Sequence, residues 1–167
     1  MDAGLLVGRL IFGGLMAAHG AQKLFGWFGG YGLTAVGGYF EGLGFRPGRL
    51  FALAASVSEL AGGLLLAAGL LGPIGPALIV AVMIVAAISV HWQHGVFAQS
   101  NGIEVPLLYG ALAVAVALAG PGAYSLDAAL GLTALWTPSI VYGALALGIL
   151  GGLGNLAVRR APIAAHA

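Results

Sequence analysis

Long apolar segments constrain this chain more than any other feature of its sequence. Residues 75–90 include no charged side chain, and further apolar segments lie on either side of them. A helix that crosses the hydrocarbon core of a bilayer needs about 20 mainly apolar residues. We therefore expect membrane-spanning helices over residues 5–22, 49–71, 75–92, 106–119 and 137–158, the fourth of them short and beginning near Glu104.

The composition excludes several other classes of protein. Hydrophobic residues make up 60% of the chain, charged residues only 7%, and the mean hydropathy is +1.05. A soluble domain carries about 25% charged residues, and a disordered chain carries more charge and fewer apolar residues. The net charge of +1 provides no basic patch for nucleic acid. Without cysteine, the chain has no disulfide or thiolate of its own.

No segment alternates polar and apolar residues as a half-buried strand does, so the expected fold class is an all-α membrane protein. Asp2 and Arg9 do not fit a cleaved signal peptide, and we expect an uncleaved first span. Glycine and proline at residues 72–76 predict a tight turn. Residues 34–43 predict a short helix at the membrane interface, and residues 126–135 are too short to span.

The distribution of lysine and arginine predicts the orientation. We call the membrane face of the N-terminus side A and the opposite face side B. With five spans, side B receives Lys23, Arg46, Arg49, Arg159 and Arg160, whereas Arg9 lies near side A. Because cytoplasmic loops carry an excess of lysine and arginine, we expect the N-terminus outside and the C-terminus in the cytoplasm.

Glycine, with 30 residues, predicts close packing between helices. Small residues allow membrane helices to approach one another closely, so they mark contact faces. The expected contact positions are Gly4, Gly8 and Gly14 in the first span, residues 61–63 and Gly69 in the second, and Gly143, Gly148, Gly151 and Gly152 in the fifth.

Two charged residues inside the expected spans need partners, because ionisable groups in a membrane usually face the protein interior or a cavity. Glu59 lies near the middle of the second span. It is either a neutral acid bonded to a neighbouring helix, or a group that pairs with a cation, contacts a ligand or handles protons. Arg9 either extends to the interface or pairs with an acid, for which Asp127 fits the topology better than the more deeply placed Glu59.

Most of the other polar residues gather at side B. His91 and His94 lie three apart, but two imidazoles do not make a tetrahedral metal site, and we expect no metal. A pocket at membrane depth with aromatic, basic and acidic groups suits a quinone, whose carbonyls need hydrogen-bond donors. The residues expected around it, with Glu59 at its floor, are His19, Lys23, Trp27, His91, His94, Asn101 and Glu104.

Four segments resemble the DoxX family of small integral membrane proteins. They are residues 19–30 (HGAQKLFGWFGG), Glu59 with the glycines at 62 and 63, residues 91–104 with the Asn-Gly-Ile-Glu ending, and residues 120–127 (GPGAYSLD). The resemblance implies a four-helix bundle in a bacterial inner membrane over residues 1–130. Residues 131–167 would then add a fifth transmembrane helix and a short tail.

The resemblance also implies a redox setting, since one branch of the family, DoxD-like, is a subunit of a thiosulfate:quinone oxidoreductase. Our leading hypothesis is a subunit of a quinone-linked redox system, in which Glu59 and His19 or His91 handle protons and Lys23 polarises a carbonyl. No motif for an intrinsic redox cofactor is present, so electrons would come from a partner, and whether the chain itself is an enzyme stays open. The alternative is a non-catalytic accessory or assembly subunit of a larger membrane complex. The expected partners are membrane lipid and protein subunits, either of such a complex or of a homo-oligomer. A transporter fits poorly, since the sequence shows no inverted repeat.

Overall fold

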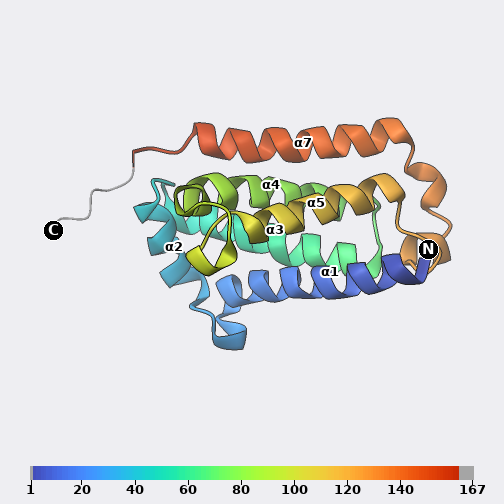
Figure 1. Ribbon diagram of the computed structural model, residues 1–167, viewed down its shortest axis with the longest axis horizontal. Coiled ribbons are helices and arrows are strands. Elements are labelled where there is room, and N and C mark those ends of the chain that lie inside the picture. Colours follow the sequence, from blue (N-terminus) through green and yellow to red (C-terminus); the bar gives the residue numbers. More distant parts are fainter. Residues whose placement is uncertain (1, 162–167) are drawn as a thin grey trace.

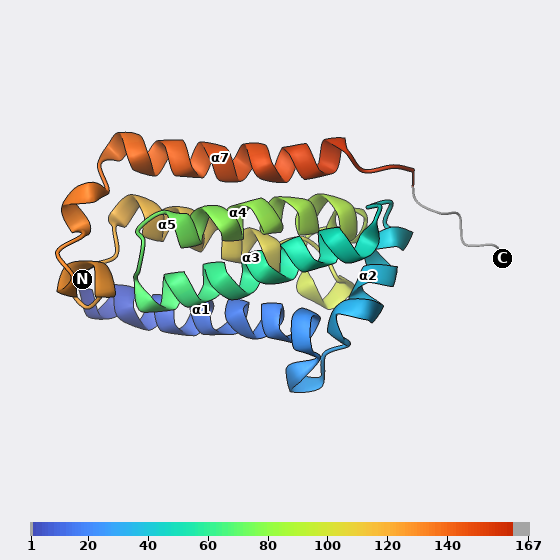
Figure 2. The same ribbon diagram turned by 180° about the vertical axis from the view of Figure 1, so that it is seen from behind.

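The computed structural model describes residues 2–161, and within them every regular element is helical. The all-α fold class is therefore confirmed. Long helices run side by side, with α3, α4 and α5 between α1 and α7 (Figures 1 and 2). Their bounds are α1 Asp2–Phe25, α3 Gly48–Ala68, α4 Ile74–Ala86, α5 Glu104–Ala119 and α7 Pro138–Ala157.

Among the described residues, four helical segments are long and apolar enough to cross a membrane, namely Asp2–Phe25, Gly48–Ala68, Ile74–His94 and Pro138–Ala157. The third of them is α4 with two short continuations, a π-helix at Ala87–His91 and a 3-10 turn at Trp92–His94. The 16 residues of α5 are fewer than the roughly 20 that a full span needs. The chain is thus a membrane protein with several apolar helices.

The connections between these helices lie at the two ends of the bundle. At the end where α1 finishes, which is side B, the chain forms the 3-10 turn Trp27–Gly29 and α2, Gly32–Gly42, close to the short helix predicted at 34–43. At side A lie α6, Leu126–Ala129, and a 3-10 turn at Thr133–Leu135. Residues 162–167 of the predicted tail are outside the described residues.

Close packing of α1 on α3 depends on glycines of each helix that lie against the backbone of the other. A Cβ at Gly20 would lie 2.4 Å from the backbone nitrogen of Leu60, and one at Gly63 would lie 2.4 Å from that of Ala17. Such distances leave room for glycine alone, as expected where small residues bring membrane helices together.

The prediction that Gly4, Gly8 and Gly14 of α1 lie at helix contacts was wrong. An added Cβ at Gly4, Gly8 or Gly14 would meet nothing within 4 Å, whereas Gly13 faces the backbone of Ala67. Gly13 and Gly14 are adjacent, and successive residues point about 100° apart around a helix. Composition therefore shows that α1 has a small-residue face but does not show which of two neighbouring glycines lies on it.

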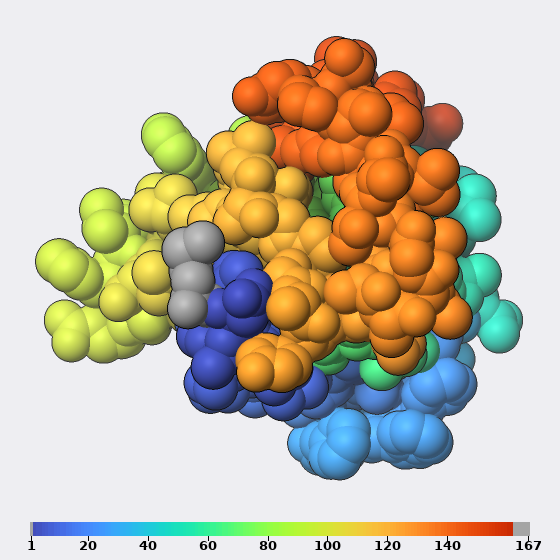
Figure 3. All heavy atoms as spheres, turned by 90° about the vertical axis from the view of Figure 1, so that its right-hand side faces the viewer, coloured from blue at the N-terminus to red at the C-terminus, as the bar shows by residue number. Residues whose placement is uncertain are grey.

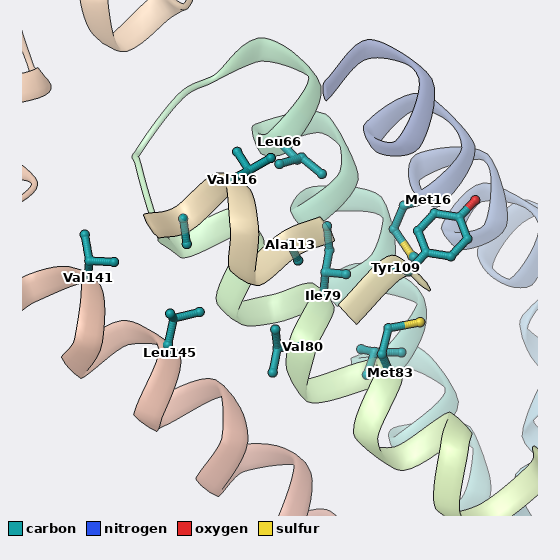
Figure 4. Packing of buried hydrophobic residues seen from close by; sticks show 12 residues of the cluster. Met16, Leu66, Ile79, Val80, Met83, Tyr109, Ala113, Val116, Val141 and Leu145 are labelled. Carbon is teal, nitrogen blue, oxygen red and sulfur yellow. The ribbon is translucent and has the colours of Figure 1, made fainter. Parts of the chain in front are cut away.

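The last helix, α7, is packed onto α4. A Cβ at Gly148 would lie 2.5 Å from the carbonyl oxygen of Ala77, so this contact is confirmed, as is that of Gly152. Gly143 and Gly151 face away with nothing within 4 Å, against the prediction. Leu145 of α7 faces Val80 of α4 within the buried apolar cluster (Figure 4). The division at residue 130 stays a prediction, but α7 shares the core of the other helices.

Candidate functional site

A buried ion pair joins α1 to α3 near side B. The ammonium Nζ of Lys23 lies 2.5 Å from Oε1 of Glu59. Glu59 is 2% exposed, whereas Lys23 is 31% exposed. The second carboxylate oxygen of Glu59, Oε2, is buried and has no partner among the described residues. Of the readings open for Glu59, the geometry favours a carboxylate paired with a cation.

The packing of the two helices brings this pair together. Gly20 of α1 faces Ser56 and Leu60 of α3, so Lys23, about one turn further along α1, lies level with the turn before Glu59. The long apolar stem of lysine can then extend along the helix and place the ammonium group at the carboxylate. Lys23 thus reaches from the end of α1 into the bundle.

Lys23 also lines a cavity of about 640 Å³ at side B. The volume lies within the roughly 300–1,000 Å³ of small-molecule sites. Its walls are mainly apolar and aromatic and come from α1, α2, α3, the α4 segment and α7. The lining residues with polar or aromatic side chains are Gln22, Lys23, Tyr31, Tyr39, Phe40, Phe45, Phe51, Ser58, Ser89, His91 and Asn155.

The short helix α2 covers this cavity at side B. Gly37 of α2 lies against Arg49 at the start of α3, and the carboxylate of Glu41 accepts a hydrogen bond of 3.1 Å from the backbone N–H of Gly48. These contacts fix α2 across the bundle end (Figure 1). Partial burial raises the pKa of Tyr39 on α2, so its hydroxyl stays protonated and can donate a hydrogen bond into the cavity.

The chain that follows α7 holds the same cover in place. Nε of Arg159 donates a hydrogen bond of 2.6 Å to the carbonyl of Leu43, and the backbone N–H of Arg160 donates one of 2.9 Å to Gly44. The Arg159 guanidinium also lies 5.9 Å from the ring centroid of Phe45, which is buried between Phe40 and Phe51. The end of α7 therefore completes the cavity wall.

A π-helical turn shapes the opposite wall. It runs through Ala87–His91, where the hydroxyl of Ser89 donates a hydrogen bond of 2.6 Å to the carbonyl of Val85. Such turns inside α-helices occur frequently at functional sites. Here the turn places Ser89 and His91 on the cavity. His91 Nδ1 lies 2.7 Å from the carbonyl oxygen of Asn101, which orients the ring.

The structure brings only part of the predicted site together. Of the predicted ligand-contacting residues, Lys23 and His91 line the cavity, and Glu59 lies behind Lys23. His19 is exposed and faces the ring of Tyr109 on α5, at 6.4 Å between centroids. The other four predicted residues, Trp27, His94, Asn101 and Glu104, are not among those that line it.

Three of those four residues build the loop that leads to α5. Oε2 of Glu104 accepts a hydrogen bond of 2.7 Å from the backbone N–H of Ala98. His94 Nδ1 lies 3.0 Å from the carbonyl oxygen of Val90. Asn101 is the residue in left-handed conformation, φ +64°, that reverses the chain. Trp27 stacks on Phe25 at 4.8 Å in the exposed turn after α1.

Arg9 and Asp127 are both buried at side A, but no direct ion pair joins them. Within residues 2–161, Lys23 and Glu59 form the one ion pair with nitrogen and oxygen closer than 4.0 Å. The guanidinium of Arg9 donates to the carbonyl of Tyr124. The carboxylate of Asp127 instead holds the turn between α3 and α4. It accepts hydrogen bonds from the backbone of Leu71 and Gly72 and from Nε1 of Trp136, at 2.9, 2.7 and 2.8 Å.

Sequence reasoning missed the aromatic half of the cavity. Tyr39, Phe40, Phe45 and Phe51 belong to the first loop and the start of α3, where the sequence predicted only a short interfacial helix at residues 34–43. Their clustering within residues 39–51 was a signal in the sequence. Asn155 had no such signal, because only the packing of α7 brings it to the cavity.

The family model named DoxX matches residues 4–92, which is more than half of the chain. The matched range contains the ion pair, α2 and most of the cavity wall, and ends just after the π-helical turn. The motifs at residues 101–104 and 120–127, as well as α7, lie beyond it. No curated protein and no solved structure matches the chain.

Proposed function

The chain belongs to the DoxX family, and we propose that it is a membrane subunit of a quinone-linked redox system that binds a quinone in the side B cavity. The observation that carries the proposal is the meeting of an aromatic cavity of about 640 Å³ with a buried ion pair at its wall. A quinone combines an apolar ring with carbonyl oxygens, so it needs such a surface together with hydrogen-bond donors.

The residues present fit this class of ligand. Phe40, Phe45 and Phe51 provide apolar contact for a ring, while Tyr39 and Lys23 provide donors. Small-molecule sites commonly combine mainly apolar walls with a few placed polar groups. The mainly apolar and aromatic walls of the cavity therefore suit an organic ligand.

A bound quinone would accept two electrons and two protons and leave as a quinol. The part played by this chain is to bind the ring and to supply protons. Lys23 Nζ polarises a carbonyl oxygen and gives a proton to it. The amine then takes up a proton from water at side B, and the negative charge of the Glu59 carboxylate, at 2.5 Å from that nitrogen, favours the return to the ammonium form. His91 lines the same cavity and serves as a second proton donor. His19 lies away from it, so we assign it no role.

Electrons come from a partner in this proposal, namely a membrane or peripheral subunit that carries a redox cofactor. We further propose that all five long helices cross a bacterial inner membrane, with α5 as a short span. Lys23, Arg46, Arg49, Arg159 and Arg160 then lie at one end of the bundle, which we assign to the cytoplasm. The quinone site would face that side.

Purification of the full chain from bacterial membrane and extraction of bound lipid test the proposal directly. We expect copurified quinone, and a rise in melting temperature when a short-tailed quinone is added, since a ligand of the folded state stabilises it. Ala86→Phe fills the cavity and should abolish both effects, whereas Ala115→Phe, on the exposed face of α5, should preserve them. Absence of quinone together with no thermal response would refute the proposal.

A second candidate is an accessory subunit that packs against a larger membrane complex. The observation that favours it is the outer face of α7, where Gly143 and Gly151 have open space around them. Outward small residues suit contact with another membrane helix. Gly143→Leu and Gly151→Leu should then prevent copurification of partner subunits without unfolding the chain. Retention of the partners in both variants would exclude α7 as the contact.

A further inference from the structure

A second cavity, of about 440 Å³, lies at side A, at the opposite end of the bundle from the proposed quinone site. The ends of α3 and α5, the start of α7 and the segment between α5 and α7 form its walls. Figure 3 looks onto this end, where that segment, in orange, lies over the ends of the other helices. Val116, Ala117 and Val141 make part of the wall apolar, and Arg9 lines the cavity too.

Arg9 is buried here with most of its hydrogen-bonding capacity unused. The residue is 1% exposed, and its Nη2 donates to the carbonyl of Tyr124. Nε and Nη1 have no partner among the described residues. A guanidinium group offers five N–H donors and stays charged, and an uncompensated charge in the interior of a protein is strongly destabilising.

The surrounding backbone makes room for this group. A Cβ at Gly69 would lie 1.5 Å from Nη1 of Arg9, so a glycine at this position is required for the guanidinium to lie where it does. Gly69 ends α3 in the left-handed conformation, with φ +62°. The guanidinium therefore packs directly against the backbone at the end of α3.

The nearby acid does not supply the missing acceptors. Both carboxylate oxygens of Asp127 accept hydrogen bonds from Leu71, Gly72 and Trp136, and they lie beyond the 4.0 Å limit of an ion pair with Arg9. Asp127 balances the charge of Arg9 only at longer range. No acceptor among the described residues meets Nε or Nη1, so a water or an anion at the adjoining cavity is left to supply one.

We propose that the side A cavity binds a phosphate-class oxyanion, with Arg9 as its anchor. Nε and an Nη nitrogen of one guanidinium suit two oxygens of the same phosphate, which is the bidentate geometry that arginine favours. The N-terminal ends of α4 and α7 border the cavity through Pro73, the N-cap of α4, and Pro138, the first residue of α7, and such ends carry the positive pole of the helix dipole. The phosphate is either free or the headgroup of a lipid whose chains follow the apolar wall.

Trp136 lines the cavity and reports on its occupancy. The other two tryptophans, Trp27 and Trp92, are exposed, so Trp27→Phe and Trp92→Phe give a full chain with one reporter. This protein is titrated in detergent with inorganic phosphate, with phosphatidic acid bearing two six-carbon chains, and with the corresponding diacylglycerol. We expect a saturable change in Trp136 fluorescence with a phosphate compound, and none with diacylglycerol.

Two variants assign the effect to the arginine. Arg9→Gln removes the charge and should weaken binding by about tenfold or more. Thr133→Glu adds a negative charge to the cavity at an exposed residue and should also weaken it, whereas Thr34→Glu on α2, at side B, should not. The comparison of Thr133→Glu with Thr34→Glu shows whether an anion binds in the side A cavity even if Arg9→Gln does not fold.

The outcomes separate the two sources of phosphate. Saturable binding of inorganic phosphate supports a free anion site, and binding of phosphatidic acid alone supports a lipid headgroup. No saturable change with either compound would overturn the proposal. So would equal binding of diacylglycerol and phosphatidic acid, or equal effects of Thr133→Glu and Thr34→Glu.

Discussion

Replacing Lys23 with methionine would keep most of the length of the side chain and remove its charge. In the native protein its ammonium group lies 2.5 Å from Glu59. The variant leaves the Glu59 carboxylate, which is 2% exposed, without a cation. The matched change, Glu59→Gln, removes the opposite charge and leaves the lysine.

The two single variants should differ in their free energies of unfolding. Removal of one partner from a buried pair costs about 3–5 kcal/mol, because the remaining charge is left without compensation. That estimate applies to Lys23→Met. In Glu59→Gln the remaining charge belongs to Lys23, which is 31% exposed and can turn toward water in the cavity. We therefore expect a smaller loss there, of about 1–2 kcal/mol, the size of a lost charged hydrogen bond.

The double variant shows whether the two residues act through each other. We expect the losses not to add, with a coupling of about 1–3 kcal/mol, as for contacting residues. Unfolding in mixed micelles of a mild detergent and dodecyl sulfate, followed by circular dichroism, gives the free energies. Arg49→Met removes an exposed charge at the same end of the bundle and serves as the control.

The reasoning rests on the unequal burial of the two partners. Equal losses in Lys23→Met and Glu59→Gln would contradict it, and a greater loss in Glu59→Gln would reverse it. Strict additivity in the double variant would show that the 2.5 Å contact contributes nothing to stability.

Three further changes test other contacts. Gly20→Leu should destabilise the fold by about 3 kcal/mol or more through overpacking between α1 and α3, whereas Gly14→Leu, in open space, should cost less than about 0.5 kcal/mol in the same assay. Trp136→Phe removes a 2.8 Å hydrogen bond to Asp127 and should lower stability by about 1.5–3 kcal/mol; an unchanged melting curve would refute this role. Arg159→Ala removes the contacts of this side chain with Leu43 and Phe45, which hold α2 over the side B cavity. The variant should release a bound short-tailed quinone faster with little loss of stability, and an unchanged dissociation rate would count against the role of α7 as a cavity wall.

The sequence predicted the helices well because the length of an apolar segment can be counted along the chain without any knowledge of tertiary contacts. The predicted segment 137–158 became Pro138–Ala157, and the segment beginning near Glu104 became Glu104–Ala119. The end of the bundle at which each loop lies follows from the same counting. The π-helical turn at Ala87–His91 was not predicted, since nothing in its composition differs from an ordinary apolar helix.

The partners of the buried charges could not be predicted in the same way, because they depend on helix rotation and on relative height. Lys23 reaches Glu59 only because Gly20 lies against Ser56 and Leu60. Asp127 was expected near side A and is there, but its oxygens meet backbone N–H groups of the α3–α4 turn, which no side-chain pattern encodes.

The contact of Arg159 with Leu43 joins residues that are 116 positions apart in the chain. Chains are synthesised from the N-terminus, so Asn155 and Arg159 are the last parts of the side B cavity to leave the ribosome. The earlier helices can insert and pair while this cavity still opens sideways to lipid. A ligand with a long tail would then reach the cavity from the bilayer before α7 docks, and each later exchange would have to pass the contact of Arg159 with Leu43. The first occupant would in that case be set during biosynthesis, by the order in which helices arrive, and later occupants by affinity at equilibrium.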